Sequence, residues 1–439
     1  MKKQERRARV CLLLTLCLFI GLSYFIYNYA HNYSDWATFY GNTQIYTDGA
    51  INRGTIVDRN DNVLLECSKE GYHYNEDYST RVSTAYVVGD MQGNVESGAI
   101  NTFKDQLIGY DLINGTFDIT DNGKKVILTI DSDVCGVAYD ELAGRTGTVG
   151  VYDWKTGEII CLVSTPGFDP EDISEDASFF NNFIDGVHTP GSTFKLVTSA
   201  AVIDNIKDRN KFTFTCDGEN YFSDNHYFRD VYAHGTVDFK DALAKSCNGA
   251  FSKLSIRLGP QILQEYVEKT GLTESIDING IKTAKGSFVF PADNDFALGW
   301  AGIGQGEDLV NPCAMMIYMG AIANKGKPVA PIIIKDTSFL KSNDSKKLGR
   351  YIDRSTAKEL KKMMKNNVVN GYGEENFEGI DLYAKSGTAE TNDGSDAWFV
   401  GFTDRYAFVV WIQNGGFGSE AAAPVAYNVL KYMENKGIE

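Results

Sequence analysis

Hydrophobic and polar positions divide the chain into three stretches. The first begins with five basic residues among its first nine positions, after which no charged residue appears from 10 to 34. At about 1.5 Å of rise per residue, the apolar run Val10–Tyr27 can cross a bilayer core of about 30 Å with modest thinning. A cleaved signal peptide is the alternative, but the run is long for one and no A-x-A site follows it. We therefore expect an uncleaved transmembrane anchor at 10–29.

The second stretch, which ends near residue 124, is mixed and polar, with many Gly, Asn and Asp residues. Its clearest pattern is RGTIVDRNDNVLLE at Arg53–Glu66, where a turn-forming cluster separates two apolar runs. Such a pattern predicts a β-hairpin.

The third stretch, from residue 125 onward, has strand patterns at both ends and helical patterns between them. Apolar runs at 148–154 and 158–164 flank a Lys-Thr-Gly turn, and two more flank Asp404–Arg405 near the chain's end. This order favours an α/β layered domain whose sheet joins both ends of the stretch. Helices are expected at 259–271, 311–324, 355–368 (with Ser355 as its N-cap) and 420–434.

The composition indicates a globular protein with a hydrophobic core and argues against a nucleic-acid partner. Of the 439 residues, 43% are hydrophobic and 12% aromatic, and the net charge is −16. Outside the N-terminus the chain has no basic run, so binding to nucleic acid is not expected.

Cysteine and histidine spacing gives no sign of a metal site. The chain has eight cysteines but no C-x-x-C, and its five histidines are widely dispersed. Only Cys67 and Cys216 are candidates for oxidation in an extracytoplasmic chain. We therefore expect neither a metal nor a cofactor.

The segment HTPGSTFKLVTSAAV, at His188–Val202, carries the first candidate chemistry. Lys195 follows Ser192 by three positions, which places both side chains on one face of a helix. Apolar neighbours disfavour the ammonium, so the neutral amine becomes accessible near neutral pH. The Pro-Gly places Ser192 near the helix start, where free N–H groups favour developing negative charge. Lys195 is therefore the expected base for Ser192.

None of the short motifs is specific alone. S-x-x-K also occurs at Ser338/Lys341, in a polar loop, and at Ser355/Lys358, on a solvated helix. S-x-N at Ser246–Asn248 follows a helical segment, and only one of three K-[ST]-G matches, at Lys385–Gly387, falls on an expected strand. The order of the three motifs is the specific signal, because penicillin-binding proteins and serine β-lactamases share it.

With TPGSTFK, KSCN, GIGQG (302–306), AKSGTAE and the RGTIVDRN box, nearly the whole chain resembles the class B penicillin-binding transpeptidases. The resemblance implies an α/β fold in which an antiparallel sheet carries helices on both faces and stands on an elongated pedestal. The implied parts are a cytoplasmic tail (1–9), the anchor (10–29), a pedestal (30–124) and a transpeptidase domain (125–439).

Roles follow from the resemblance, position by position. Ser192 would be the acylated nucleophile, Lys195 its base and Ser246 a proton relay to the leaving group. The Asn248 amide would hold the substrate's peptide backbone. Backbone N–H groups of Ser192 and Thr388 would form the oxyanion hole. The substrate would further be held by Lys385, Ser386, Gly387 and Thr388.

The implied function is cross-linking of peptidoglycan stem peptides through a serine acyl-enzyme made from a D-Ala-D-Ala donor, with covalent inhibition by β-lactams. The catalytic domain would lie outside the bacterial cytoplasmic membrane. About ninety residues separate the anchor from that domain, too few for a glycosyltransferase domain. Glycan polymerisation would therefore come from a partner, a multi-spanning membrane polymerase.

Several alternatives stay open. A serine β-lactamase would use a deacylating segment, which Glu307–Asn311 formally matches, although we interpret it as a helix entry loop. A penicillin sensor, a non-catalytic scaffold of the wall-synthesis complex and a D,D-carboxypeptidase are the others. The chain also departs from the family at three positions: Ser386 where Thr is common, Asp61 where Gly is usual and Leu65 where Ala is usual.

Overall fold

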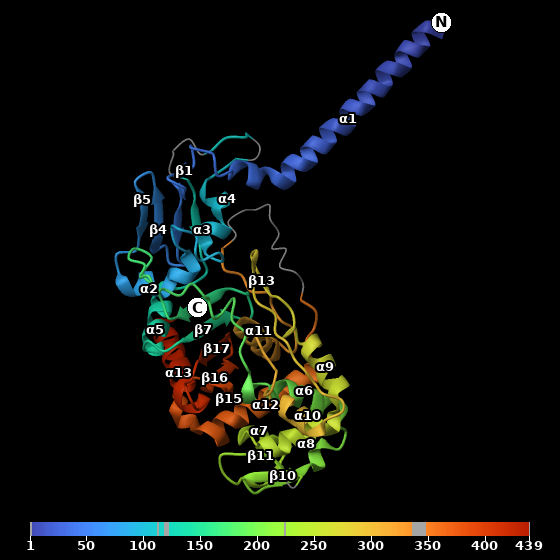
Figure 1. Ribbon diagram of the computed structural model, residues 1–439, viewed down its shortest axis with the longest axis vertical. Coiled ribbons are helices and arrows are strands. Elements are labelled where there is room, and N and C mark those ends of the chain that lie inside the picture. Colours follow the sequence, from blue (N-terminus) through green and yellow to red (C-terminus); the bar gives the residue numbers. More distant parts are fainter. Residues whose placement is uncertain (1, 112–113, 118–122, 224, 336–347, 439) are drawn as a thin grey trace.

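The computed structural model describes residues 2–111, 114–117, 123–223, 225–335 and 348–438 (Figure 1). Helix α1 (Lys2–Ala37) extends away from the rest of the molecule. Its segment Lys3–Tyr33 is long and apolar enough to cross a membrane, and none of that stretch is buried. This agrees with the expected anchor. The S-x-x-K match at Ser338/Lys341 lies outside the described residues.

A small sheet lies beside the inner end of α1, with its strands in the order β5-β4-β3-β6. Strands β3 and β4 form the hairpin expected at 53–66. In its turn, Asp61 adopts a φ of 66°, in the left-handed region where glycine is usual and Asp is tolerated. Strand β6 runs parallel to β3 and completes this sheet. The elements of this part are β1 (Tyr46–Thr47), β2 (Ala50–Ile51), β3 (Thr55–Val57), β4 (Val63–Ser68), β5 (Gly71–Tyr74), α2 (Tyr78–Val88), α3 (Ala99–Thr102), α4 (Lys104–Leu107) and β6 (Lys125–Ile127).

The larger sheet joins the two ends of the third stretch, as the sequence predicts. Its strand order is β15-β16-β17-β7-β8, and each neighbouring pair is antiparallel. Strands β7, β8 and β17 are buried along their whole length, so both faces of the sheet must be covered. The strands are β7 (Gly147–Asp153), β8 (Ile159–Thr165), β15 (Tyr383–Thr391), β16 (Gly394–Phe402) and β17 (Tyr406–Ile412).

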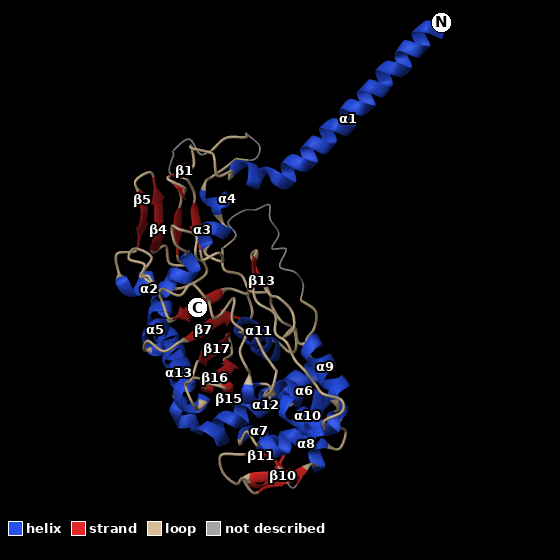
Figure 2. Ribbon diagram, viewed as in Figure 1, coloured by secondary structure: helices blue, strands red, loops and turns tan. Residues whose placement is uncertain are grey.

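Helices cover both faces of this sheet (Figure 2). Helices α5 (Ser132–Leu142) and α13 (Gly418–Lys436) pack together on one face, whereas α11 (Pro312–Ala323) packs on the other. Helix α12 (Arg354–Asn367) contacts α11, β15 and α6 (Lys195–Asn205). The expected N-cap Ser355 is wrong. Helix α12 begins at Arg354, and the N-cap is Asp353, a residue type that suits this position equally well.

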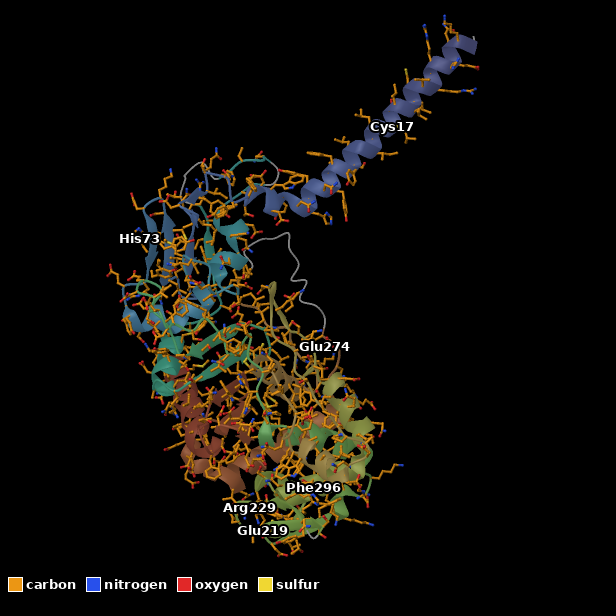
Figure 3. All side chains as sticks on the ribbon, in the orientation of Figure 1. Cys17, His73, Glu219, Arg229, Glu274 and Phe296 are labelled. Atoms are coloured by element: carbon orange, nitrogen blue, oxygen red, sulfur yellow. The ribbon has the colours of Figure 1, made fainter. Side chains whose placement is uncertain are left out.

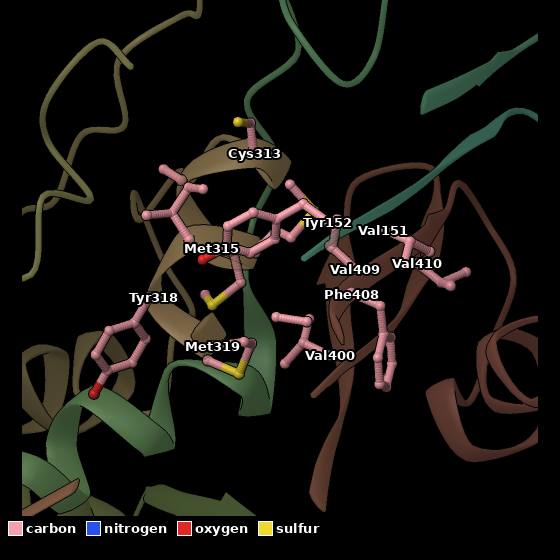
Figure 4. Close-up of a cluster of buried hydrophobic side chains, with 14 of the residues drawn as sticks. Val151, Tyr152, Cys313, Met315, Tyr318, Met319, Val400, Phe408, Val409 and Val410 are labelled. Carbon is pink, nitrogen blue, oxygen red and sulfur yellow. The ribbon is translucent and has the colours of Figure 1, made fainter. Parts of the chain in front are cut away.

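Helix α11 forms the middle of the core. Every one of its residues is buried, as expected of a helix that is apolar on all sides. Its Met315 and Met319 face Tyr152 and Val400 of the sheet (Figure 4). A Cβ at Gly320 would lie 1.8 Å from the Tyr152 hydroxyl oxygen, so this glycine allows the helix to approach the sheet.

The end of the molecule farthest from α1 is a lobe of short helices and two small strand pairs, β9–β12 and β10–β11. Among the described residues each of these four strands has one hydrogen-bonded neighbour, so this part of the lobe forms strand pairs and no extended sheet. Its elements and the remaining short ones are η1 (Gly191–Thr193), η2 (Arg209–Lys211), β9 (Thr213–Cys216), β10 (Glu219–Ser223), β11 (His226–Arg229), β12 (Gly235–Asp238), α7 (Phe239–Ala244), α8 (Asn248–Leu258), α9 (Pro260–Lys269), β13 (Asp277–Ile278), β14 (Ile281–Lys282), α10 (Asp295–Ala301), η3 (Val368–Gly373) and η4 (Glu374–Phe377).

Candidate active site

Ser192 lies in the short turn η1 that leads into α6, and Lys195 is the first residue of that helix. Lys195 is fully buried, and its Nζ donates a 3.0 Å hydrogen bond to Ser192 Oγ. The turn fits against β15 because Gly191 has a φ of 52° and no Cβ, which would lie 2.5 Å from the Thr388 carbonyl oxygen. The local sequence Pro-Gly-Ser therefore positions the hydroxyl against both the lysine and the sheet edge.

The S-x-N motif forms the opposite side of the site, in the turn between α7 and α8. Ser246 has a φ of 55°, an uncommon value for a residue with a Cβ. Lys195 Nζ donates to the Ser246 carbonyl oxygen (2.5 Å), to Ser246 Oγ (3.2 Å) and to Asn248 Oδ1 (2.7 Å). Lys195 thus joins the first two motifs through one ammonium or amine group.

The third motif lies on β15, as expected. Lys385 is fully buried and its Nζ donates to Ser246 Oγ (3.0 Å) and to the Ser386 carbonyl oxygen (2.7 Å). Gly387 permits close packing against η1, since a Cβ there would lie 2.8 Å from Thr193 Cγ2. Thr388 Oγ1 accepts a 3.4 Å hydrogen bond from the Gly418 N–H at the start of α13.

Burial sets the electrostatics of the two lysines. Desolvation lowers the pKa of Lys195 to about 8, although Asp230 and Cys247 oppose the shift. Desolvation also lowers the pKa of Lys385 well below its usual range, and the charge of Lys195 adds to this effect. Desolvation therefore makes a neutral amine at Lys195 accessible near neutral pH, whereas the repulsion between the two lysines disfavours the charge on Lys385.

These residues lie in a cleft of about 860 Å³. Arg229 and Glu219, at the lobe end in Figure 3, form an ion pair of 2.8 Å on its wall. The cleft is large enough for a peptide substrate. The predicted residues that line it are Ser192, Ser246, Asn248, Ser386 and Thr388.

The sequence analysis missed three contributors to the site. The Tyr372 hydroxyl accepts a 2.7 Å hydrogen bond from the Ser386 N–H. Asp230 Oδ1 accepts a 2.6 Å hydrogen bond from the Asn248 N–H at the start of α8. Gln305, within the GIGQG segment, donates through Nε2 to the Thr388 carbonyl oxygen at 3.4 Å. Only the last had a sequence signal, because its segment was already part of the motif set.

Asn248 also has more protein partners than expected. Its Oδ1 accepts from Lys195, and its Nδ2 donates to the Arg229 carbonyl oxygen at 2.7 Å. One N–H of the amide group is therefore left for a ligand. The amide also holds the lysine and ties α8 to the end of β11.

Neither Glu307 nor Asn311 lines the cleft. Asn311 is buried as the N-cap of α11, and its Nδ2 donates to three backbone carbonyls, including that of Gly186 at 2.8 Å. Glu307 is exposed and does not line the cleft. The segment is thus a helix entry loop, as interpreted from the sequence.

Trp398 and two cysteines lie outside the catalytic set. Trp398 is fully buried, and its Nε1 donates to the Thr189 carbonyl oxygen at 2.9 Å, so it packs beneath the segment that leads to Ser192. Cys67 and Cys216 are both free thiols, so the suspected oxidation of either is not found among the described residues.

Comparison with known proteins agrees with this geometry. Residues 147–431 match the penicillin binding protein transpeptidase domain family. Stage V sporulation protein D of Bacillus subtilis is 28% identical over 79% of this chain and 59% of its own length. Peptidoglycan D,D-transpeptidase PbpA of Mycobacterium tuberculosis is 25% identical over 65% of this chain and 66% of its own length. The chain therefore spans less than two thirds of each relative.

Solved structures share the fold at lower identity. Penicillin-binding protein A of M. tuberculosis, determined as a penicillin G acyl-enzyme complex, superposes with a TM-score of 0.73 at 22% identity, covering 87% of this chain and 99% of its own. Penicillin-binding protein PBP2 of Helicobacter pylori, determined with MreC, gives a TM-score of 0.74 at 18% identity, covering 89% of this chain and 99% of its own.

Proposed function

The chain belongs to the penicillin-binding protein transpeptidase family, and from this premise we propose that it is a class B peptidoglycan D,D-transpeptidase. The single observation that carries the proposal is the fully buried Lys195, hydrogen-bonded to Ser192 and Ser246 at once. A serine hydroxyl needs a base to become a nucleophile, and this lysine is close enough to supply one.

In the proposed acylation, the neutral Lys195 amine takes the Ser192 proton while Oγ attacks the carbonyl of the penultimate D-Ala of a stem peptide. The backbone N–H groups of Ser192 and Thr388 stabilise the oxyanion, a device worth about 3 kcal/mol per donor in other enzymes. Ser246 passes the proton to the departing D-Ala amine. An acyl-enzyme ester remains on Ser192.

The second half of the proposed reaction, deacylation, regenerates the free enzyme. The amine of a neighbouring stem peptide attacks the ester carbonyl and loses its proton through Ser246 and Lys195, and Ser192 leaves with a proton. Lys385, with Ser386, Gly387 and Thr388 of the same strand, binds the terminal carboxylate of the donor. The free Asn248 N–H binds the peptide backbone of the donor. A β-lactam resembles the donor and would form the same ester.

We also propose the division of the chain into tail (1–9), anchor (10–29), pedestal (30–124) and catalytic domain (125–439). Strand β6 links the last two parts, because it begins at residue 125 and pairs with β3. Basic residues before the anchor favour a cytoplasmic N-terminus and an extracytoplasmic catalytic domain. A wall-synthesis partner at the pedestal, including a membrane glycan polymerase, is consistent with this arrangement.

The test uses the full chain in detergent, mixed with penicillin G and followed by intact mass over hours. We expect a long-lived adduct of one penicillin per chain, absent in Ser192→Ala and present in Ser199→Ala, a buried serine of α6 about two helical turns after Ser192. An adduct that disappears while the drug is consumed would favour a β-lactamase. No adduct on either variant or the unaltered chain would favour a non-catalytic scaffold.

Release of D-Ala from a synthetic donor, measured with and without an acceptor amine, separates the two remaining activities. A transpeptidase forms the cross-linked product in proportion to acceptor. A carboxypeptidase releases D-Ala equally well without it.

A further inference from the structure

Four buried side chains of metal-ligating types meet behind the S-x-N motif. Cys216, Asp230, His234 and Cys247 each offer one donor atom, and these atoms all lie within 4.8 Å of one another. Three of the donors surround one carboxylate oxygen, Asp230 Oδ2. The distances to it are 3.3 Å from Cys216 Sγ, 3.4 Å from Cys247 Sγ and 3.9 Å from His234 Nδ1.

The spacing of the donors suits a small tetrahedral ion. Zinc binds sulfur at about 2.3 Å and nitrogen or oxygen at about 2.0–2.2 Å, which places neighbouring ligand atoms about 3.3–3.8 Å apart in a tetrahedron. The two sulfur–oxygen separations are about 0.1–0.2 Å shorter than the edge of such a tetrahedron, and the nitrogen–oxygen separation of 3.9 Å is about 0.3 Å longer than its edge, so small shifts of the side chains would admit the ion.

His234 gives an independent indication of a ligand. Its side chain is 3% exposed, and its Nδ1 has no hydrogen-bond partner among the described residues. A buried ring nitrogen without a partner is costly. The same nitrogen faces the two thiols and the carboxylate, so a metal bond would satisfy it.

We propose that Cys216, Asp230, His234 and Cys247 bind one zinc ion in a closed, four-coordinate structural site. Two thiolates, one imidazole and one carboxylate form a donor set typical of zinc, and four protein ligands leave no open position for a reacting water. Calcium and magnesium, which prefer oxygen ligands, are disfavoured.

Groups around the donors support them as metal ligands usually require. Asn220 Nδ2 donates to Cys216 Sγ at 3.6 Å, and the Ala250 N–H donates to Cys247 Sγ at 3.5 Å. The second carboxylate oxygen of Asp230 accepts from the Asn248 N–H. These hydrogen bonds orient the ligands and stabilise negative charge on sulfur.

The site would join three parts of the lobe. Cys216 ends β9, Asp230 follows β11, His234 precedes β12 and Cys247 is the N-cap of α8. Two-stranded pairs are marginal on their own, so an ion that joins both pairs to a helix stabilises all three.

The ion would also position the catalytic turn, and this part rests on the proposed function. Cys247 lies between Ser246 and Asn248, both of which contact Lys195. A fixed Cys247 restrains the strained turn at Ser246. Zinc here is a positioning element and takes no part in the reaction.

The main rival is a Cys216–Cys247 disulfide, which an extracytoplasmic chain could form in place of metal binding. A purely hydrogen-bonded cluster, with both thiols donating to Asp230, is the second rival. Both predict a chain that neither holds nor takes up zinc.

The first experiment measures metal content in the full chain, purified in detergent without a polyhistidine tag. We expect one zinc per chain by inductively coupled plasma mass spectrometry, and less than a tenth of that in Cys216→Ser and Cys247→Ser. Cys313→Ala, a buried cysteine outside the cluster, should keep its zinc. Cobalt exchanged into the unaltered chain should give a thiolate-to-cobalt charge-transfer band.

The second experiment removes zinc from the unaltered chain with EDTA and returns it. We expect the melting temperature to fall by several degrees and penicillin acylation to slow tenfold or more, and zinc alone to restore both. Absence of zinc together with no uptake on titration, or a mass two units lower with a Cys216–Cys247 peptide link, overturns the site.

Other outcomes separate the two proposals. Zinc binding without any effect of EDTA on acylation overturns the positioning role and leaves the site. A chain that binds zinc but is never acylated by penicillin overturns the proposed function while the metal site stands.

Discussion

The two walls of the cleft are built in different ways. The core wall consists of β15 at the edge of the large sheet, η1, which packs on this strand, and α6, which packs against α12. It is held by apolar burial around Phe194, Leu196 and Val197. The lobe wall, residues 216–248, consists of short strand pairs and a helix start gathered around polar groups at Asp230. Apolar packing therefore positions the catalytic groups of the core wall, whereas hydrogen bonds and the proposed zinc ion position those of the lobe wall.

Lys195 shows why the difference matters. It belongs to the core wall, whose burial lowers its pKa, but three of its four hydrogen bonds go to the lobe wall. The core wall thus lowers the pKa of the base, and the hydrogen bonds of the lobe wall orient its amine. Disturbing the two walls should have separable effects on rate and local stability.

The largest effect on the acylation rate is expected for Lys195, which contacts both walls. Lys195→Met removes the base and its hydrogen bonds to the second motif, so penicillin acylation should slow by about 10²–10⁴-fold, the range for general acid–base catalysis. Stopped-flow or quenched mass measurement of the adduct gives the rate. Lys253→Met, an exposed lysine on α8, is the matched control. A loss below tenfold in a folded Lys195→Met chain would exclude this base.

The next effect tests the packing of the core wall. In Gly387→Ala, the added Cβ would lie 2.8 Å from Thr193 Cγ2 and 3.0 Å from the Pro190 carbonyl oxygen. The turn bearing Ser192 must then shift, and displacements of this size cost about 10–100-fold in rate. Acylation should slow by that factor while zinc content stays unchanged. The control is Gly349→Ala, which has open space around it; equal rates in both variants would contradict the proposed contact.

The pH dependence of acylation is expected to report burial in the core wall. The neutral Lys195 amine is the active form, and its pKa is lowered to about 8, so the active fraction increases as pH rises through 8. Acylation should be about tenfold faster at pH 9 than at pH 7, and level above pH 9. Rates are measured with the drug's own hydrolysis subtracted at each pH. A profile that is flat from pH 6 to 9 would mean that the lysine is neutral throughout.

Local patterns explain how much of this architecture could be predicted. The strand pair at 148–164, the hairpin at 53–66 and the helix starting near Ser192 each depend on neighbouring residues, and the structure confirms them. Motif order then identified the groups that converge on Lys195, because the fold brings the three motifs together.

What the sequence did not reveal depends on contacts between distant segments. Cys216 and Cys247 are 31 positions apart and match no short metal motif, so their meeting with His234 depends on the pairing of β9 with β12. Tyr372 lies in η3, and its bond to the Ser386 N–H likewise depends on tertiary packing. Missing the Asp353 cap had a simpler cause, since two suitable cap residues lie two positions apart.

The smallest effect on rate is expected in the lobe wall, where stability should respond instead. Asn220 donates to Asp230 Oδ2 at 3.0 Å and to the Phe228 carbonyl oxygen at 3.1 Å. Asn220→Ala leaves these buried acceptors with fewer partners, at a cost of about 1–3 kcal/mol. The backbone amides within 216–248 should exchange about tenfold faster or more, and those of the core wall should change little, because the two regions open separately. Acylation should slow only a few-fold, since Lys195 keeps its burial.

Asn205→Ala, which changes an exposed asparagine on α6, is the control and should leave hydrogen exchange in the lobe wall unchanged. If protection fell equally in both walls, they would form one cooperative unit, and the distinction between them would be limited to composition.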